Sequence, residues 1–283
     1  MLRKRPAPPP SYQEPGLRLW QGEAGTILQR LPRHSVDCIA CSSPYYGQRD
    51  YGVAAQIGLE ADPLTYLADL AAVFRAAVRL LRPSGSLWIN LADTYWSGRG
   101  APSRPDPKSG RRRFARPQDG RGSHPWCWPK QLLLLPHRLL ILLSAQGWQH
   151  VATYPWQKLH PLPDPPRDRL PHQHEWVFHL VRGAYYWQPG ADWPLDPIWE
   201  LAPARRAVRG LTGPARAPEG LLGPPTLATC PPGGTVLDPF CGTGTTLVRA
   251  RATGRQAWGI DLDPAALEVA QQRLTGPQQG RFG

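Results

Sequence analysis

The sequence predicts an α/β protein built around a sheet with parallel strands. Two observations carry this prediction. Short apolar runs of strand length alternate with segments of helical spacing in the first part of the chain, and a glycine-rich turn stands between a strand and a helix near its end. With 283 residues, 41% of them hydrophobic, the chain has room for one large domain or for one domain with an inserted lobe.

The first part of the chain alternates three strands with two helices. The compact run of Val, Cys, Ile and Ala at 36–40 is typical of a buried parallel strand. Asp62 and Pro63 are suited to the N-cap and the first position of a helix, and Pro83 to Gly85 end it. The predicted elements are strand 17–20, helix 25–31, strand 36–40, helix 63–82 and strand 86–91.

The second part of the chain resumes this alternation after an irregular stretch. Gly147 is a natural end for a helix, and a proline-rich loop separates the two strands that follow it. The predicted elements are helix 136–146, strands 148–156 and 175–181, strand 235–237, glycine turn 238–244, helix 245–252, strand 257–260 and helix 264–274.

These elements define one domain with flexible ends. We expect a disordered arm at 1–15, a single domain at 16–274 and a tail at 275–283. Within the domain, 97–125 and 188–232 lack periodicity and are candidate DNA-recognition regions. The first of them carries eight basic and two acidic residues, so its net charge of +6 is half of the chain's +12. We expect this loop to be disordered alone and to order against phosphates.

Composition excludes several classes of protein. The excess of 33 Lys and Arg over 21 Asp and Glu favours a polyanionic partner. No signal peptide or membrane span is evident, because the best apolar run, 132–143, is short and broken by Pro136, His137 and Arg138. The five cysteines include no Cys-x-x-Cys pair, so we expect no disulfide framework and no metal site, and a cytoplasmic location.

The glycine turn at 238–246 predicts a nucleotide-like ligand. Glycines between a strand and a helix let the backbone approach a ligand closely, and the helix N-terminus offers unpaired N–H groups to an anion. Asp261 ends the next strand, 23 residues after Asp238, where an acid can accept hydrogen bonds from both ribose hydroxyls.

The run Asp238-Pro-Phe-Cys-Gly-Thr-Gly-Thr-Thr246 resembles motif I of the amino-group DNA methyltransferases, which bind S-adenosylmethionine. The resemblance implies that this turn lines the methionine end of the cofactor, that Asp261 holds the ribose and that Glu23 lies near the adenine. The implied cofactor-binding residues are Glu23, Asp238, Pro239, Phe240, Cys241, Gly242, Gly244, Thr245, Thr246, Asp261 and Leu262. Cys241 is expected to be a small spacer and not a reactive thiol.

A second turn, Ser42-Ser43-Pro44-Tyr45, resembles motif IV of the same family, which usually has Pro where this chain has Ser43. An exocyclic amine is a poor nucleophile because its lone pair is delocalised into the ring. The Ser42 hydroxyl and the Ser43 carbonyl can accept its hydrogens and help the nitrogen become tetrahedral. Tyr45 is expected to stack on a base flipped out of the duplex. The chain has no Pro-Cys dipeptide, which carbon-5 cytosine methylation requires.

The order of the two turns is also informative. Because both must lie at the carboxyl ends of neighbouring parallel strands, the fold is predicted to be circularly permuted, with the catalytic turn before the cofactor turn. That order resembles the β group of amino-methyltransferases. The resemblance implies a Rossmann-like S-adenosylmethionine-dependent methyltransferase fold, with a mixed sheet, helices on both faces and an inserted DNA-recognition lobe.

The implied function is transfer of a methyl group to N4 of a flipped cytosine in duplex DNA, since position 42 is Ser. Two alternatives stay open: methylation of adenine at N6, and an inactive DNA-binding protein on the same fold. The family suggests duplex DNA and a cognate restriction endonuclease as partners. The chain is expected to be a monomer or a homodimer. His174 and Glu175 are expected to be structural. Candidate DNA contacts are Arg49, Arg111, Arg112, Arg113, Lys158 and His160.

Overall fold

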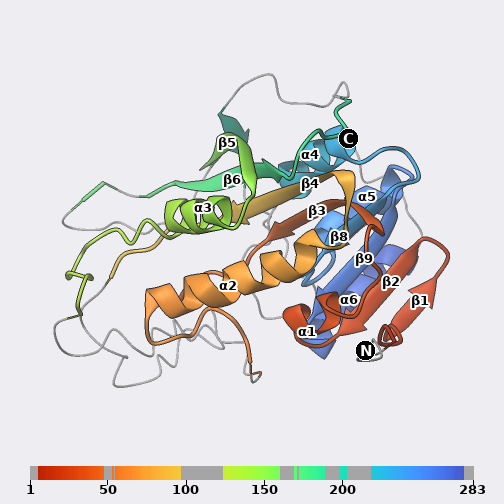
Figure 1. Cartoon of the computed structure of the whole chain (residues 1–283), viewed down its shortest axis with the longest axis horizontal. Coiled ribbons are helices and arrows are strands. Elements are labelled where there is room, and N and C mark those ends of the chain that lie inside the picture. Colours follow the sequence, from red (N-terminus) through yellow and green to blue (C-terminus); the bar gives the residue numbers. More distant parts are fainter. Residues whose placement is uncertain are drawn as a thin grey trace.

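The computed structural model in Figure 1 describes residues 6–47, 53, 55–96, 124–159, 169–170, 172–188, 198–202 and 218–276. In these residues one sheet of nine strands forms the centre of the molecule, in the order β1-β2-β9-β8-β3-β4-β6-β5-β7. The run from β2 to β4 is parallel, whereas β1 pairs antiparallel with β2, and β6 pairs antiparallel with both β4 and β5. The sheet is therefore mixed, as predicted.

The strands keep the predicted positions and add two short edge strands. Their bounds are β1 Tyr12–Glu14, β2 Leu17–Gln21, β3 Val36–Ser42, β4 Leu81–Leu91, β5 Gln149–Lys158, β6 His174–Val181, β7 Trp199–Leu201, β8 Thr235–Asp238 and β9 Gln256–Asp261. The strands β3 and β8 are buried on both faces, which explains their continuous apolar sequences.

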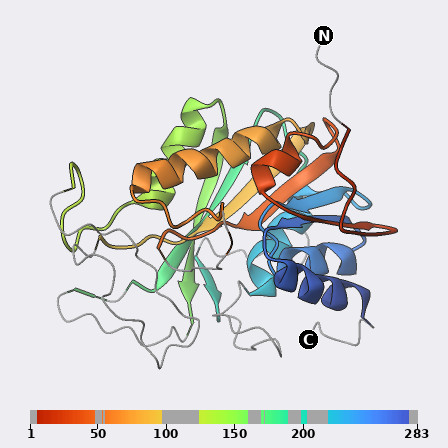
Figure 2. The ribbon, with the colours of Figure 1, turned by 90° about the horizontal axis from the view of Figure 1, so that it is seen from below.

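The described part has six helices, and three of them pack on each face of the sheet. Figure 2 shows the helices on opposite sides of the sheet. They are α1 Ala24–Leu28, α2 Pro63–Val78, α3 Leu135–Ala145, α4 Glu219–Thr229, α5 Thr245–Ala252 and α6 Pro264–Thr275. The helices α1 to α3 bury Leu28, Phe74 and Leu139 against one face. The helices α4 to α6 bury Leu222 and Leu247, among others, against the opposite face.

Two helix starts follow directly from the sequence, and one does not. The Asp62 carboxylate accepts the Thr65 N–H at the start of α2, and Asp263 accepts the Ala265 N–H at the start of α6, each followed by a proline. Helix α3 has no local side-chain cap. Instead Asp93, at the end of β4, accepts the Leu135 N–H across 3.1 Å, so a long-range contact supplies the cap.

Two predicted boundaries need correction. The arm predicted at 1–15 is wrong for Tyr12–Glu14, which form β1 against β2. The helix predicted to reach Arg82 ends at Val78, because Leu81 already pairs with Val36 in β4. The chain between Arg82 and Gly85 bulges within that strand, and the Pro-Ser-Gly sequence of the bulge resembles the end of a helix.

The stretch 188–232, predicted to be irregular, contains β7 and α4. Pro224 and Pro225 lie inside α4 and give this segment the composition of a loop. The helix persists because its apolar residues pack on the sheet. Of the loop predicted at 97–125, only residues 124–125 belong to the described part.

The topology brings the ends of the central strands together. The parallel strands β9, β8, β3 and β4 are consecutive in the sheet, so their carboxyl ends share one edge. No helix in the described part of the chain is long and apolar enough to cross a membrane.

Candidate functional site

The two predicted turns leave neighbouring strands at the same edge of the sheet. Strand β8 runs directly into the glycine turn, and β3 runs directly into the catalytic turn. Cys38 of β3 pairs with Val236 of β8, and Ile39 pairs with Leu237. Both turns therefore begin within a few residues of these paired positions. The prediction that both lie at the carboxyl ends of adjacent parallel strands is confirmed.

The glycine turn is shaped by two residues with positive φ. Gly242 has φ +50° and Gly244 has φ +77°. Residues with a side chain rarely adopt these backbone angles. A Cβ on Gly242 would meet nothing within 4 Å, so its backbone faces open space, whereas a Cβ on Gly244 would press on Ala270 at 3.1 Å. Gly242 therefore leaves room for a ligand, and Gly244 lets α5 pack against α6.

Asp261 ties this turn to the neighbouring strand. One carboxylate oxygen accepts the Gly242 N–H across 2.6 Å, and the other accepts the Asp263 N–H across 2.9 Å. Burial raises the pKa of Asp261, and these backbone donors oppose that shift by favouring the ionised form. Each oxygen keeps a further lone pair, as an acceptor of ribose hydroxyls requires.

Asp238 and Arg273 hold the glycine turn from either side. The Asp238 carboxylate is buried and accepts the Phe240 N–H across 3.0 Å, and burial raises the pKa of Asp238 to about 7. Arg273 on α6 donates to the Thr243 carbonyl across 2.5 Å and to the Thr245 hydroxyl across 3.3 Å. No sequence pattern points to Arg273, because it lies among polar residues of a surface helix.

The other predicted cofactor residues lie around the same edge. Pro239 and Thr246 are buried, while Thr245 and Leu262 are partly exposed. Phe240 is also partly exposed, and its ring meets that of Phe74 edge to face at 6.5 Å.

Two further predictions concern residues beside the turn. Cys241 is buried, and burial raises the pKa of its thiol well above the usual value, which agrees with a spacer role. Glu23 follows β2, next to the end of β9, and its carboxylate caps α1 by accepting the Gly25 N–H across 2.6 Å.

The catalytic turn is contacted by three other parts of the chain: β4, α2 and the segment at Gly58. The Ser43 N–H donates to the Asn90 carbonyl of β4 across 3.1 Å, which extends the β3–β4 ladder by one bond. The hydroxyl of Tyr66 on α2 donates to the Pro44 carbonyl across 2.8 Å. Gly58, with φ +113°, passes so close that a Cβ there would lie 2.8 Å from the Tyr45 carbonyl oxygen.

A fully buried amide, Asn90, lies behind this turn. Its Oδ1 accepts the Ser42 hydroxyl across 2.8 Å and the Tyr45 hydroxyl across 2.9 Å. Its Nδ2 donates to Glu175 across 3.0 Å and to the Trp176 carbonyl across 3.3 Å. All four hydrogen-bonding positions of the amide are thus used, which fixes its orientation.

Glu175 and Lys158 complete the cluster. The single hydrogen of the Tyr45 hydroxyl is shared between Asn90 and Glu175, whose other carboxylate oxygen lies 2.6 Å from the Lys158 ammonium. Lys158, predicted to contact DNA, is thus paired with an acid of the neighbouring strand. The other predicted DNA contacts, Arg49, Arg111, Arg112, Arg113 and His160, lie outside the described residues.

Sequence reasoning misses the roles of Asn90 and Glu175. A signal for Asn90 is present, since an amide within the apolar strand 86–91 must find buried partners. Glu175, expected to be structural, also begins an apolar strand and is only 3% exposed. Their joint contact with Ser42 and Tyr45 depends on the order β3-β4-β6, which the sequence does not reveal.

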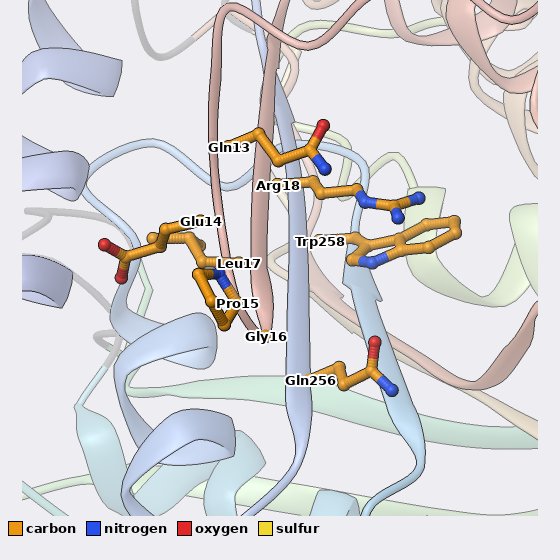
Figure 3. Close-up of a pocket in the computed structure, with 8 residues that line it drawn as sticks. All are labelled: Gln13, Glu14, Pro15, Gly16, Leu17, Arg18, Gln256 and Trp258. Atoms are coloured by element: carbon orange, nitrogen blue, oxygen red, sulfur yellow. The ribbon is translucent and has the colours of Figure 1, made fainter.

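An open pocket of about 460 Å³ lies elsewhere. Figure 3 shows the residues that line it. It is lined by residues at the start of β2 and β9, including Leu17, Gln256 and Trp258, with Arg18 over the Trp258 ring at 5.0 Å. These are the amino ends of the parallel strands, opposite both turns, so this pocket is separate from the site.

The permuted sheet and its two adjacent turns define an S-adenosylmethionine-dependent methyltransferase fold. Solved structures share it. The PvuII DNA methyltransferase, which is cytosine-N4-specific, superposes with a TM-score of 0.69 at 16% identity, over 98% of this chain and 92% of that one. A protein of Thermus thermophilus, described as a DNA modification methylase and crystallised with S-adenosyl-L-methionine, gives 0.62 at 23% identity, over 91% and 92%.

Sequence comparison then identifies the family. The profile of the DNA methylase family matches residues 36–272. The type II methyltransferase M.Cfr9I of Citrobacter freundii is 37% identical over 92% of this chain and 88% of its own length. M.SmaI of Serratia marcescens is 34% identical over 89% of each. The chain belongs to the N6/N4 family of DNA methylases, so it is a DNA methyltransferase that uses S-adenosylmethionine.

Proposed function

We propose that the chain methylates N4 of a cytosine flipped out of duplex DNA. The observation that carries this proposal is Ser42 at the start of the catalytic turn, with its hydroxyl hydrogen directed to Asn90. Members of the family that act on adenine more often carry Asp or Asn at this position. The similarity of the fold to a cytosine-N4-specific enzyme supports the same choice.

The glycine turn and Asp261 fit the cofactor. The open space above Gly242, the N–H groups at the start of α5 and the acid at the end of β9 suit an amino acid carboxylate and a ribose. When bound, S-adenosylmethionine supplies a methyl group on a sulfonium, and transfer forms the C–N bond, breaks the C–S bond and leaves S-adenosylhomocysteine and one proton.

The catalytic turn prepares the amine of the target base. Because the Ser42 hydroxyl donates to Asn90, its oxygen is left as an acceptor for one hydrogen of the amine. The Ser43 carbonyl accepts the other. Holding both hydrogens directs the lone pair of nitrogen out of the ring plane, which favours in-line attack. The Tyr45 ring, fixed through its hydroxyl, stacks on the flipped base.

We further propose that the chain is the modification enzyme of a restriction–modification pair. This proposal is supported by its relatives M.Cfr9I and M.SmaI, which are type II methyltransferases. A DNA substrate favours a location in the cytoplasm, in contact with the nucleoid.

The direct test is identification of the methylated base. Purified protein is incubated with labelled S-adenosylmethionine and bacterial DNA that lacks amino-methylation, and the nucleosides are separated by mass spectrometry. N4-methylcytosine is the expected product. N6-methyladenine would show that Ser42 does not select the base, and would favour the adenine alternative. The proposed function would be contradicted if neither methylated base were found. This outcome requires that the protein is folded, binds the cofactor and is given DNA of varied sequence.

The basic loop at 97–125 is proposed to contact DNA phosphates. Its excess positive charge predicts that deletion weakens DNA binding and flattens the dependence of affinity on salt, by about 0.9 in the log–log slope for each lost phosphate contact. Binding to a DNA duplex is measured at several salt concentrations. Unchanged slope and affinity, with cofactor affinity retained, would exclude the loop from the DNA interface.

A further inference from the structure

The ion pair between Lys158 and Glu175 reaches the catalytic turn from the antiparallel part of the sheet. We infer that these two residues are positioning residues for methyl transfer, which hold Asn90 and Tyr45 in place so that Ser42 acts only as an acceptor. This inference rests on the proposed chemistry of an exocyclic amine, but it does not depend on whether the base is cytosine or adenine.

Burial of Glu175 makes a partner for its carboxylate necessary. Glu175 is 3% exposed, and an unpaired carboxylate at such a position would be strongly destabilising. It is neutralised by the Lys158 ammonium across 2.6 Å and accepts hydrogen bonds from Tyr45 and Asn90. The Lys158 side chain is 27% exposed, so the positive end of the pair faces the rim of the site.

The pair lies beside the catalytic turn. Glu175 lies at the start of β6 and Lys158 at the end of β5, where the two antiparallel strands reach the edge that carries the catalytic turn. The ladder of β5 and β6 runs from Gln149 to Gln157, next to Lys158. Glu175 contacts both Lys158 and Tyr45, so it links the end of β5 to the turn.

The orientation of the Asn90 amide determines which atom it presents to Ser42. Its oxygen faces the Ser42 and Tyr45 hydroxyls, while its two hydrogens are accepted by Glu175 at 3.0 Å and by the Trp176 carbonyl at a longer 3.3 Å. If Glu175 were absent, only the longer bond to Trp176 would oppose a rotation that presents the NH₂ group to Ser42. The Ser42 hydroxyl would then accept from Asn90 and turn its hydrogen toward the incoming amine, which is the wrong polarity for catalysis.

The contacts of the Tyr45 hydroxyl with Asn90 and Glu175, which we call the tether, also orient the Tyr45 ring. Its one hydroxyl hydrogen is shared between the Asn90 oxygen and Glu175, so both ends of its side chain are fixed. A ring fixed in advance loses less conformational freedom when a base stacks on it, and binding of the flipped base is correspondingly favoured.

The test compares Glu175→Gln, Tyr45→Phe and the double variant in the full-length protein. The first change leaves Lys158 without a counter-charge, while the second keeps the aromatic ring and loses only the tether. With DNA and S-adenosylmethionine saturating, we expect each single variant to lower the rate constant of methyl transfer by roughly 10- to 100-fold. The double variant should lose no more than about the larger single effect, because both changes break one network.

Two substitutions of Lys158 separate positioning from DNA binding. Lys158→Arg retains the ion pair and should remain within about threefold of the wild type, whereas Lys158→Met should lower the saturating rate by about tenfold. The matched control is Arg82→Met. It breaks the 3.1 Å ion pair between Arg82 and the buried Asp37, at the amino end of β3. It should leave the rate unchanged. Thermal unfolding and cofactor binding establish that each variant is folded.

The outcomes distinguish this inference from the proposed function. Loss of the saturating rate in Tyr45→Phe and Lys158→Met, with the wild type active, supports positioning. Near-normal rates in both variants would overturn it while the methyltransferase assignment stands. If Lys158→Met changes only the KM for DNA and its salt dependence, Lys158 binds phosphate and the inference is wrong. A wild-type protein that yields no methylated base contradicts the proposed function instead.

Discussion

The glycine turn at 238–246 and the catalytic turn at 42–45 follow neighbouring parallel strands, yet different parts of the chain support them. Gly242 is held by Asp261, 19 residues away, and the turn keeps its shape through glycines of its own. Tyr45 is held by Glu175, 130 residues away. The cofactor half of the site is thus a nearly local structure, whereas the catalytic half depends on how β4 and β6 are placed in the sheet.

The largest expected effect lies in the catalytic turn. Ser42→Ala removes an acceptor that acts on the amine as it becomes tetrahedral, and loss of one such group costs roughly 100- to 1,000-fold in rate. Cofactor affinity should stay close to that of the wild type, since Ser42 belongs to the other turn. Single-turnover methyl transfer and calorimetric titration of S-adenosylmethionine measure the two quantities. Turnover near that of the wild type would remove Ser42 from the mechanism.

Asp261→Ala should reverse this pattern. It removes the acceptors for the ribose and leaves the Gly242 N–H without its partner, so cofactor affinity should fall by roughly 10- to 100-fold, as expected for lost charge-assisted hydrogen bonds. The rate at saturating cofactor should change much less. Calorimetric titration and single-turnover assays again measure the two quantities.

The matched control for this prediction is Asp263→Ala, two residues further along. This change removes only the cap of α6, so it should cost about 1 kcal/mol of stability and no cofactor affinity. Equal losses of affinity in both variants would mean that Asp261 acts only by shaping the loop.

A pH experiment sharpens the description of the glycine turn. Burial raises the pKa of Asp238 to about 7, so the cofactor-free folded protein binds a proton that the unfolded chain releases near pH 4. Its contribution to stability therefore falls as the pH rises from about 4 to 7 and stays low above that. The part of this loss that lies above pH 5 is about 2–3 kcal/mol, from roughly two pH units at 1.36 kcal/mol each.

The comparison for this experiment is Asp238→Asn, which keeps an acceptor for the Phe240 N–H and cannot ionise. The free energy of unfolding is measured for both proteins between pH 5 and pH 8. The wild type should lose stability relative to the variant across this range. Parallel curves would show that Asp238 does not titrate there.

These differences explain what the sequence can predict. The glycine turn, Asp238 and Asp261 are predictable because their constraints are local: positive φ requires glycine, and an acid ends the next strand. Helices α2 and α6 follow from their Asp-Pro starts. Most strands follow from apolar runs.

The remaining features depend on long-range contacts. Helix α4 escapes prediction because Pro224 and Pro225 lie inside it, and the start of α3 is capped by Asp93, two residues after β4. The support of Ser42 by Asn90 and Glu175 requires β6 to lie beside β4. No pattern within either segment specifies this neighbour.

The smallest expected effect tests how far the dependence of the catalytic turn on remote residues extends. Tyr66→Phe on α2 removes the hydroxyl that donates to the Pro44 carbonyl and changes nothing else in a buried ring. We expect a loss of about 1 kcal/mol in stability and less than about tenfold in methyl transfer, since the backbone bond of Ser43 to Asn90 remains.

The control, Tyr12→Phe, removes a hydroxyl that donates to Glu14 at the far end of the sheet and should not affect the rate. If Tyr66→Phe instead matches Ser42→Ala, α2 sets the position of the catalytic turn as strongly as the sheet does. If it equals Tyr12→Phe, the strands β4 and β6 alone are sufficient.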